Sequence, residues 1–239
     1  MANVLITGIS GFVGSHLASA LKITGNEIGK CKDKNANIIG LVRDQIPSVW
    51  LEEALDDVTL VRGDIRDYKL VNRIINHYDV DKIYHIAAFA NVKQAYKNPI
   101  NVYGSNVMGT VNILEAARNV GKDNIKILIF NTDKVYGEKL DAVETDKYEA
   151  SEPYATSKVC QGFVGLSYKK TYGMNVKMSS CCNIFGYDPF NSRLIPNVVK
   201  QCIEGESPVI WNNDKSVREY VYIDDVMKND FVIKGSIKD

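Results

Sequence analysis

The stretch NVLITGISGFVGSHLA, residues 3–18, decides the fold. Its apolar start predicts a buried β-strand, which runs into a glycine-rich turn and then into an amphipathic helix over about residues 14–24. Gly8, Gly11 and Gly14 have GxxGxxG spacing, which allows a tight turn and brings free backbone N–H groups at the helix start close to a bound pyrophosphate. The spacing alone also fits a plain strand-to-helix turn, but its position after a buried first strand favours a dinucleotide cofactor.

The rest of the chain alternates short β-branched runs with longer amphipathic stretches, the pattern of a parallel sheet covered by helices. These runs are nearly all apolar, which we expect when both faces of the sheet are buried. They are NIIGLVRD (37–44), VTLVRGD (58–64), KIYHIAA (82–88), IKILIFN (125–131) and VKMSSCCN (176–183). We therefore predict an α/β fold with a doubly wound parallel sheet, the Rossmann domain, over residues 1–185. A small, shortened substrate-binding lobe, interleaved with the sheet, is predicted over residues 186–239.

The composition indicates a soluble globular protein with a small partner. Lys and Arg balance Asp and Glu at 29 each among 239 residues, so we expect no basic stripe for nucleic acid. The N-terminal MANVLITGIS lacks the features of a signal peptide, and no apolar run approaches the ~20 residues that span a bilayer. We expect a cytoplasmic protein with no membrane partner. The polar stretch GNEIGKCKDKNAN (25–37) predicts a surface insertion.

The five cysteines lack the spacing of a metal site. We expect reduced thiols and no bound metal. Cys181 and Cys182 are adjacent within a predicted strand, so their side chains should point to opposite faces of the sheet. The cysteines are Cys31, Cys160, Cys181, Cys182 and Cys202.

The ends of the second and third predicted strands bear on the choice of cofactor. An acidic residue at the end of the second strand binds the ribose of NAD, whereas an arginine favours the 2′-phosphate of NADP. Arg43 holds the edge position and Asp44 follows it, so both cofactors remain open. Asp64, at the end of the third strand, is placed either to reach the adenine or to cap the next helix.

Tyr154 and Lys158 form a YxxxK pair within EPYATSKVCQGFVGLSYKK (152–170), a helical stretch. Residues four apart lie on one helical face, so the lysine ammonium can stand beside the phenol and favour the phenolate, which is a usable base. Such a pair occurs by chance in many helices. Here it follows a dinucleotide fold and Thr132, which a buried strand delivers to the carboxyl edge of the sheet.

Asp133 and Lys134 follow Thr132 directly. A carboxyl group and an amine at this edge could serve as general acid and general base, or they could be a solvated pair at a strand end. The residue types alone leave both readings open.

Six motifs, in this order, resemble those of the extended short-chain dehydrogenases/reductases that act on nucleotide sugars, the NAD-dependent epimerase/dehydratase family. They are Thr7 with GISGFVG, GDIRD (63–67), HIAA (85–88), Asn106 in SNVMGT, TDKVYG (132–137) and YATSK (154–158). The resemblance runs from Met1 to about Asp225. Asp133 followed by Lys134 is similar to the pattern of the 4,6-dehydratases, whereas epimerases usually carry small residues there. The GLVRD and TDK segments look most like the CDP-glucose 4,6-dehydratase-like sugar-nucleotide dehydratases.

The resemblance implies a dehydratase that converts an NDP-hexose into a 4-keto-6-deoxy sugar nucleotide by internal hydride transfer through a tightly bound NAD or NADP. Tyr154 would take the proton of O4, with Thr132 hydrogen-bonded to that oxygen. Lys134 or a neighbour would remove the C5 proton, and Asp133 would protonate the departing O6 hydroxyl. The implied catalytic residues are Thr132, Asp133, Lys134, Tyr154 and Lys158.

The resemblance also implies which residues contact the cofactor. His85 is expected near the cofactor as structural support, and Asn106 is expected to order the helix behind Tyr154. The implied cofactor contacts are Gly8, Gly11, Phe12, Val13, Gly14, Arg43, Asp64, Ile65, Ala87, Ala88, Asn106, Tyr154 and Lys158.

Asn183, Arg193 and Arg218 match places where relatives hold the substrate diphosphate, and the planar guanidinium suits that ligand. The sequence departs from the family pattern at two places that concern substrate binding. Ser180 stands where relatives often have arginine, and the chain stops at Asp239, soon after YIDDV. The resemblance further implies a homodimer, formed through two long helices. The alternatives are an NDP-sugar 4-epimerase or reductase, or a non-catalytic dinucleotide-binding protein with an incomplete substrate lobe.

Overall fold

The computed structural model describes residues 2–22, 36–43, 58–122, 124–187, 193–210 and 217–229. Nearly all of the expected surface insertion lies outside the described residues, as do Cys31, Asp44 and residues 230–239.

A six-stranded parallel sheet forms the centre of the molecule, in the order β3-β2-β1-β4-β5-β6. This order reverses direction between β1 and β4, where a doubly wound sheet opens a crevice at the carboxyl ends of its strands. The predicted Rossmann sheet is therefore confirmed. The strands are β1 (Asn3–Thr7), β2 (Asn37–Val42), β3 (Val58–Arg62), β4 (Lys82–His85), β5 (Lys126–Thr132) and β6 (Val176–Cys181).

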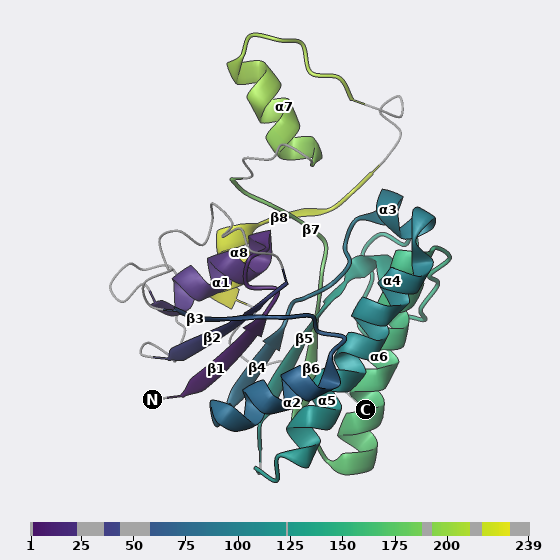
Figure 1. Cartoon of the computed structure of the whole chain (residues 1–239). Helices are drawn as coiled ribbons and strands as arrows, with labels where there is room; N and C mark the ends of the chain where they lie inside the picture. Colours follow the sequence, from purple (N-terminus) through teal and green to yellow (C-terminus); the bar gives the residue numbers. More distant parts are fainter. Residues whose placement is uncertain are drawn as a thin grey trace.

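Helices cover both faces of the sheet (Figure 1). One face packs against α1 (Phe12–Lys22) and α8 (Ile223–Asn229), and the other packs against α2 (Tyr68–His77), α5 (Gly109–Asn119) and α6 (Pro153–Tyr172). Alternate residues of a strand point to opposite faces, so Val4 and Ile6 enter the first core whereas Leu5 enters the second. Burial on both faces explains why the strands read as continuous apolar runs.

Two local features differ from the sequence expectation. The first helix begins at Phe12, two residues earlier than expected, so Gly14 lies inside its first turn. The run VTLVRGD is not buried on both faces: β3 has one neighbour in the described sheet, and its side chains are half-buried to exposed. A strand at the edge of a sheet needs fewer covering side chains than a central one.

Shorter elements complete the described structure. A small parallel pair lies outside the main sheet, and α7 stands away from the sheet at the top of Figure 1. No described helix is long and apolar enough to cross a membrane. The elements are α3 (Val92–Lys97), α4 (Pro99–Tyr103), the π-helical turn η2 (Gly104–Met108), the 3-10 turn η3 (Asp133–Tyr136), β7 (Asn183–Phe185), α7 (Leu194–Ile203) and β8 (Tyr220–Tyr222).

The turn between β1 and α1 requires glycine at two positions. Gly8 has φ of 72°, and a Cβ there would lie 2.8 Å from the Cα and N atoms of Ala87. A Cβ on Gly14 would lie 2.2 Å from the carbonyl oxygen of Gly8. Both obstacles are backbone atoms, which cannot rotate away. The first turn of α1 can rest on the end of β1 only because these side chains are absent.

We predict that Gly14→Ala lowers the free energy of unfolding by about 3 kcal/mol, the upper range for overpacking in a rigid site. Gly104→Ala is the matched control, because its new Cβ would lie 3.5 Å from a flexible arginine side chain. Urea denaturation followed by circular dichroism measures both. Equal stability of the two variants would contradict the close approach of α1 to β1.

Candidate active site

A cavity of about 340 Å³ opens at the carboxyl ends of the strands, beside the glycine turn. It brings together residues that are up to about 100 positions apart in the sequence. Seven of the predicted cofactor contacts line it: Gly8, Gly11, Arg43, Asp64, Ile65, Ala87 and Ala88. The first helical turn of α1 follows the glycine turn directly in the sequence and contains Phe12, Val13 and Gly14.

Asp64 lines this cavity and is held by an arginine that the sequence analysis did not single out. Its carboxylate accepts hydrogen bonds from the backbone N (2.9 Å), Nε (3.0 Å) and Nη2 (2.7 Å) of Arg66. The Arg66 hydrogen bond lowers the pKa of Asp64, and the charge of Arg43 adds to this effect. Arg66 also donates to Asn101 Oδ1 at 3.0 Å, which links this corner to α4. The motif GDIRD contained the arginine, but its spacing did not indicate the pairing.

The helix-cap reading of Asp64 is wrong. Asp67 is the N-cap of α2, because its Oδ1 accepts the backbone N–H of Leu70 at 3.0 Å. The carboxylate of Asp64 is therefore not used by α2 and stays at the cavity wall.

The carboxyl end of β5 places three predicted catalytic side chains together. The Thr132 hydroxyl donates to Asp133 Oδ1 at 2.9 Å and lies near enough to the phenol of Tyr154 to lower its pKa. Tyr154 stands at the start of α6, where Glu152 caps the helix by accepting the backbone N–H groups of Tyr154 (2.7 Å) and Ala155 (2.6 Å). A strand end and a helix start, both fixed by hydrogen bonds, thus hold Thr132 and Tyr154 against each other.

Tyr154 is nearly buried, and burial raises the pKa of its phenol to about 12. The neighbouring Thr132 hydroxyl and the charge of Arg193 oppose this rise, whereas Glu152 and Asp133 add to it. The phenol is therefore protonated at neutral pH in this state of the protein. To act as a base it needs a further positive charge close by.

Lys158 lies on the same buried face of α6 as Tyr154, as the four-residue spacing predicted. Its ammonium, however, does not rest on the phenol: Nζ donates to the carbonyl oxygen of Phe130 at 2.7 Å and to Gln161 Oε1 at 2.6 Å. Burial lowers the pKa of Lys158 to about 7. A buried ammonium needs acceptors, and a backbone carbonyl and an amide oxygen offer better ones than a protonated phenol.

His85 and Asn106 lie fully buried between the sheet and the helices. The His85 ring contacts the hydroxyls of Thr7 and Thr110, each at 2.8 Å, and burial lowers the pKa of His85 to about 3, so the ring is neutral. Asn106, in the π-helical turn, accepts the N–H of Phe89 at 2.7 Å and donates to Ser157 Oγ at 2.8 Å. These contacts tie the segment after β4 to α6. Within the described residues no group of three potential ligands could hold a metal ion.

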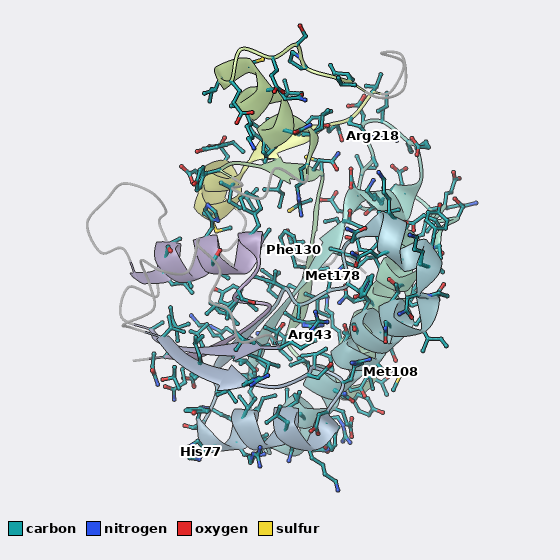
Figure 2. All side chains as sticks on the ribbon, turned by 45° about the horizontal axis from the view of Figure 1, so that its top comes forward. Arg43, His77, Met108, Phe130, Met178 and Arg218 are labelled. Atoms are coloured by element: carbon teal, nitrogen blue, oxygen red, sulfur yellow. The ribbon has the colours of Figure 1, made fainter. Side chains whose placement is uncertain are left out.

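The three predicted diphosphate contacts lie in different settings. Arg193 stands over the Phe12 ring at 5.8 Å, and its charge reaches Tyr154. Arg218 forms an exposed ion pair with Glu138 at 2.6 Å, toward the α7 side of the molecule (Figure 2). Asn183 Nδ2 donates to the carbonyl of Glu219 at 3.1 Å and joins β7 to the segment before β8. Arg193 is thus the one of the three whose charge acts on the Thr132–Tyr154 pair.

The cysteines of the described chain are free thiols. Cys181 ends β6 and is buried, whereas the adjacent Cys182 follows the strand and is half-buried. Burial raises the pKa of Cys182, and the charge of Asp133 adds to this effect. These settings agree with the expected reduced thiols at Cys160, Cys181, Cys182 and Cys202.

The sheet order, the glycine turn and the Tyr154–Lys158 helix define a Rossmann protein of the short-chain dehydrogenase/reductase type. Comparison with known proteins gives the family. The model of the GDP-mannose 4,6 dehydratase family matches residues 5–233, and the chain belongs to this family. A dTDP-glucose 4,6-dehydratase of Xanthomonas campestris pv. campestris is 28% identical, over 94% of this chain and 65% of the relative.

Solved structures agree with this fold. A dTDP-glucose 4,6-dehydratase from Bacillus anthracis in complex with NAD has a TM-score of 0.79 at 25% identity, over 96% of this chain and 72% of that one. A UDP-glucose 4-epimerase from Thermotoga maritima, with UDP-glucose, has a TM-score of 0.81 at 24% identity, over 94% of this chain and 71% of that one. The chain spans 65% of the length of the curated relative and 71% and 72% of the lengths of the two solved chains.

We predict that His85 makes the protein lose stability as the pH falls. Its pKa is about 3 in the folded protein against 6.5 without burial, so below pH 6.5 only the unfolded chain takes up the proton. The contribution is complete above pH 6.5 and is lost as the pH falls toward 3, by at most about 1.4 kcal/mol per pH unit.

Urea denaturation between about pH 6.5 and about pH 5 measures this loss. His85→Asn should show a shallower dependence on pH, whereas His77→Asn, at an exposed histidine of α2, should keep the wild-type slope. A wild-type slope in His85→Asn would mean that the ring is not held neutral.

Proposed function

We propose that this chain is a sugar-nucleotide 4,6-dehydratase, a lyase that converts an NDP-hexose into its 4-keto-6-deoxy product. The observation that carries the proposal is the constellation at the end of β5. There the Thr132 hydroxyl donates to the carboxylate of Asp133 and lies near enough to the phenol of Tyr154 to lower its pKa. Oxidation at C4 needs a proton acceptor at O4, and the later loss of the C6 hydroxyl needs an acid; Tyr154 and Asp133 offer these two groups. Membership of a 4,6-dehydratase family supports the same reaction.

The cavity beside the glycine turn fits a dinucleotide cofactor. Its wall includes Gly8 and Gly11, which carry no side chains, in the turn that leads directly into the start of α1, and such a place favours a pyrophosphate. Asp64 faces the same cavity with a carboxylate that can accept hydrogen bonds from an adenosine. When bound, NAD or NADP would supply a hydride acceptor for C4 and, in its reduced form, a hydride donor for C6, and it would therefore stay bound throughout the cycle.

The residues of the chain have separate proton-transfer roles. The Tyr154 phenolate would take the O4 proton, with the Thr132 hydroxyl hydrogen-bonded to the same oxygen. Lys134 would remove the C5 proton, and Asp133 would give a proton to the O6 hydroxyl, which leaves as water. Lys158 would hold the cofactor. The half-buried positions of Asp133 and Lys134 keep both accessible to a ligand.

The substrate would lie between the end of β5 and the segment after residue 185. We assign Arg193, Asn183 and Arg218 to its diphosphate and residues 186–239 to part of a substrate-binding lobe. Engagement of Arg218 requires that its exposed ion pair with Glu138 opens, which costs little because exposed pairs are weak. Assembly as a homodimer in the cytoplasm completes the proposal.

A 4-epimerase is the second candidate, since a structure of this type has a TM-score of 0.81 to the chain. It would use the same Tyr154 and Thr132 for oxidation at C4 but would not need Asp133 as an acid. The products therefore distinguish the two reactions.

We predict that the purified protein, given NDP-hexoses with different bases, forms a 4-keto sugar that develops an ultraviolet chromophore in alkali. Tyr154→Phe should lower kcat by at least about a thousandfold, since it removes the base. Asp133→Asn should lower it by about a hundredfold. Mass spectrometry of the product should show the loss of one water.

Tyr172→Phe is the matched control, because Tyr172 is half exposed at the other end of α6, about 27 Å from Tyr154. It should keep the wild-type rate. Inversion at C4 without loss of water would favour the epimerase. Absence of any product, with cofactor bound, would favour a non-catalytic binding protein.

We predict that Arg43 sets the choice of cofactor. Its guanidinium stands at the cavity wall near the end of β2, where a 2′-phosphate would lie, and Figure 2 shows it at the sheet. Arg43→Asp should weaken NADP binding at least about tenfold more than NAD binding, which corresponds to about 1.4 kcal/mol. Arg62→Asp on β3 is the control, and calorimetry measures both cofactors. Equal weakening of NAD and NADP would contradict this role.

A further inference from the structure

A continuous chain of buried hydrogen bonds runs from the glycine turn to Lys158. Thr7, the last residue of β1, contacts His85 Nδ1 at 2.8 Å, and His85 Nε2 contacts Thr110 Oγ1 at 2.8 Å. Gln161 Nε2 donates to the same Thr110 oxygen at 2.8 Å, and Lys158 Nζ donates to Gln161 Oε1 at 2.6 Å. All five side chains are at most 3% exposed. These hydrogen bonds therefore join β1, β4, α5 and α6, and of the five side chains only Lys158 keeps any exposure to solvent.

Counting protons fixes the direction of each bond. The Thr110 hydroxyl has one proton, and it donates this proton to the carbonyl of Asn106 at 2.7 Å. Thr110 Oγ1 must then accept from both of its other neighbours. The neutral His85 ring therefore carries its proton on Nε2, and its Nδ1 accepts the Thr7 proton. Thr7 in turn accepts the backbone N–H of Ala87 at 3.2 Å.

The same count fixes the amide of Gln161. Its NH₂ group faces Thr110, which can only accept, so its oxygen must face the ammonium of Lys158. The reversed amide would set NH₂ against an ammonium and an oxygen against a hydroxyl with no proton left to give. Both contacts would then be lost inside a dry site, where an unpaired polar group costs about 1–3 kcal/mol.

We propose that Gln161 is a positioning residue for Lys158, and that Thr7, His85 and Thr110 hold the Gln161 amide with its oxygen toward the ammonium. This inference rests on the proposed role of Lys158 in the cofactor site. Gln161 and the Phe130 carbonyl occupy two of the three ammonium protons and leave the third for a ligand. Because Thr7 directly precedes the glycine turn, these hydrogen bonds couple the position of the turn to the position of the Lys158 ammonium.

Among the described residues, Gln161 provides the side chain that accepts a hydrogen bond from Lys158 Nζ. The ammonium donates to the Phe130 carbonyl on β5 and to Gln161 on α6. His85 is neutral, and it lies close enough to Lys158 that the ammonium would repel a charged ring. Asn131 Nδ2 donates to the backbone carbonyl of Lys158 at 3.3 Å and fixes the main chain rather than the ammonium. The charged groups that act on Tyr154 are Glu152, Asp133 and Arg193.

Lysine side-chain NMR of the full chain tests the proposal without any need for catalysis. The pKa of Lys158 is followed through its Cε resonance, assigned by its loss in Lys158→Met, with and without saturating NAD. Gln161→Glu should raise the pKa of Lys158 by more than about one unit, because it sets a carboxylate beside the ammonium. Gln161→Met, which keeps the length but has no acceptor, should lower it and weaken NAD binding about tenfold.

Met178→Leu is the matched control. Met178 packs on Gly162, the residue after Gln161, and keeps its volume in this exchange (Figure 2 labels Met178). It should leave both the pKa of Lys158 and NAD binding at their wild-type values. Unchanged values in Gln161→Met would overturn the proposal, and so would equal shifts in Met178→Leu, which would indicate a general loosening of the core.

A measurement on the unaltered protein keeps the proposal testable if a variant does not fold. Long-range ¹H–¹⁵N NMR should show His85 as the neutral Nε2–H tautomer at neutral pH. The Nδ1–H tautomer or a charged ring would overturn the proton count and the proposal with it. If the NMR results hold while no dehydratase product forms, the positioning role stands and the proposed reaction is wrong. If product forms, Gln161→Met should lower kcat about tenfold with a smaller effect on KM.

Discussion

The close backbone approach at the end of β1 governs the arrangement of the site. Because Gly14 has no side chain, the first turn of α1 rests on the carbonyl of Gly8, and because Gly8 has a positive φ, the chain can turn there. The turn sets the cavity wall on one side and ends β1 at Thr7 on the other. From Thr7 the buried hydrogen bonds lead through the helix layer to Lys158. One contact between backbones thus fixes both the glycine turn and the start of the buried hydrogen bonds.

Burial dominates the electrostatics at the end of β5. It raises the pKa of Tyr154 to about 12 and lowers that of Lys158 to about 7, so it disfavours the charged form of each. These two shifts oppose the sequence expectation, in which the ammonium would stabilise the phenolate directly. The ammonium instead finds its acceptors at Phe130 and Gln161. Positive charge must therefore reach the phenol from another source, and Arg193 already supplies part of it.

The doubly wound parallel sheet could be predicted because it follows from local patterns: apolar runs of strand length, turn residues after each run and helical stretches between them. The cavity residues Gly8 and Arg43 could be predicted because a parallel sheet delivers strand ends to one edge, whereas Ala87 was implied by the family resemblance. Asp64 and Asp67 show the limit of such reasoning. Both follow a strand and precede a helix, and only the backbone path decides that Asp67 meets the N–H of Leu70 while Asp64 meets Arg66.

The sequence by itself determined the doubly wound sheet, the glycine turn and the shared face of Tyr154 and Lys158, because each depends on spacing within one segment. The tertiary structure alone decided where the Lys158 ammonium points, which nitrogen of His85 carries the proton and which way the Gln161 amide faces. Thr7, His85, Thr110 and Gln161 come from four separate elements, and their hydrogen bonds are fixed by how those elements pack and by how few protons a buried hydroxyl can give.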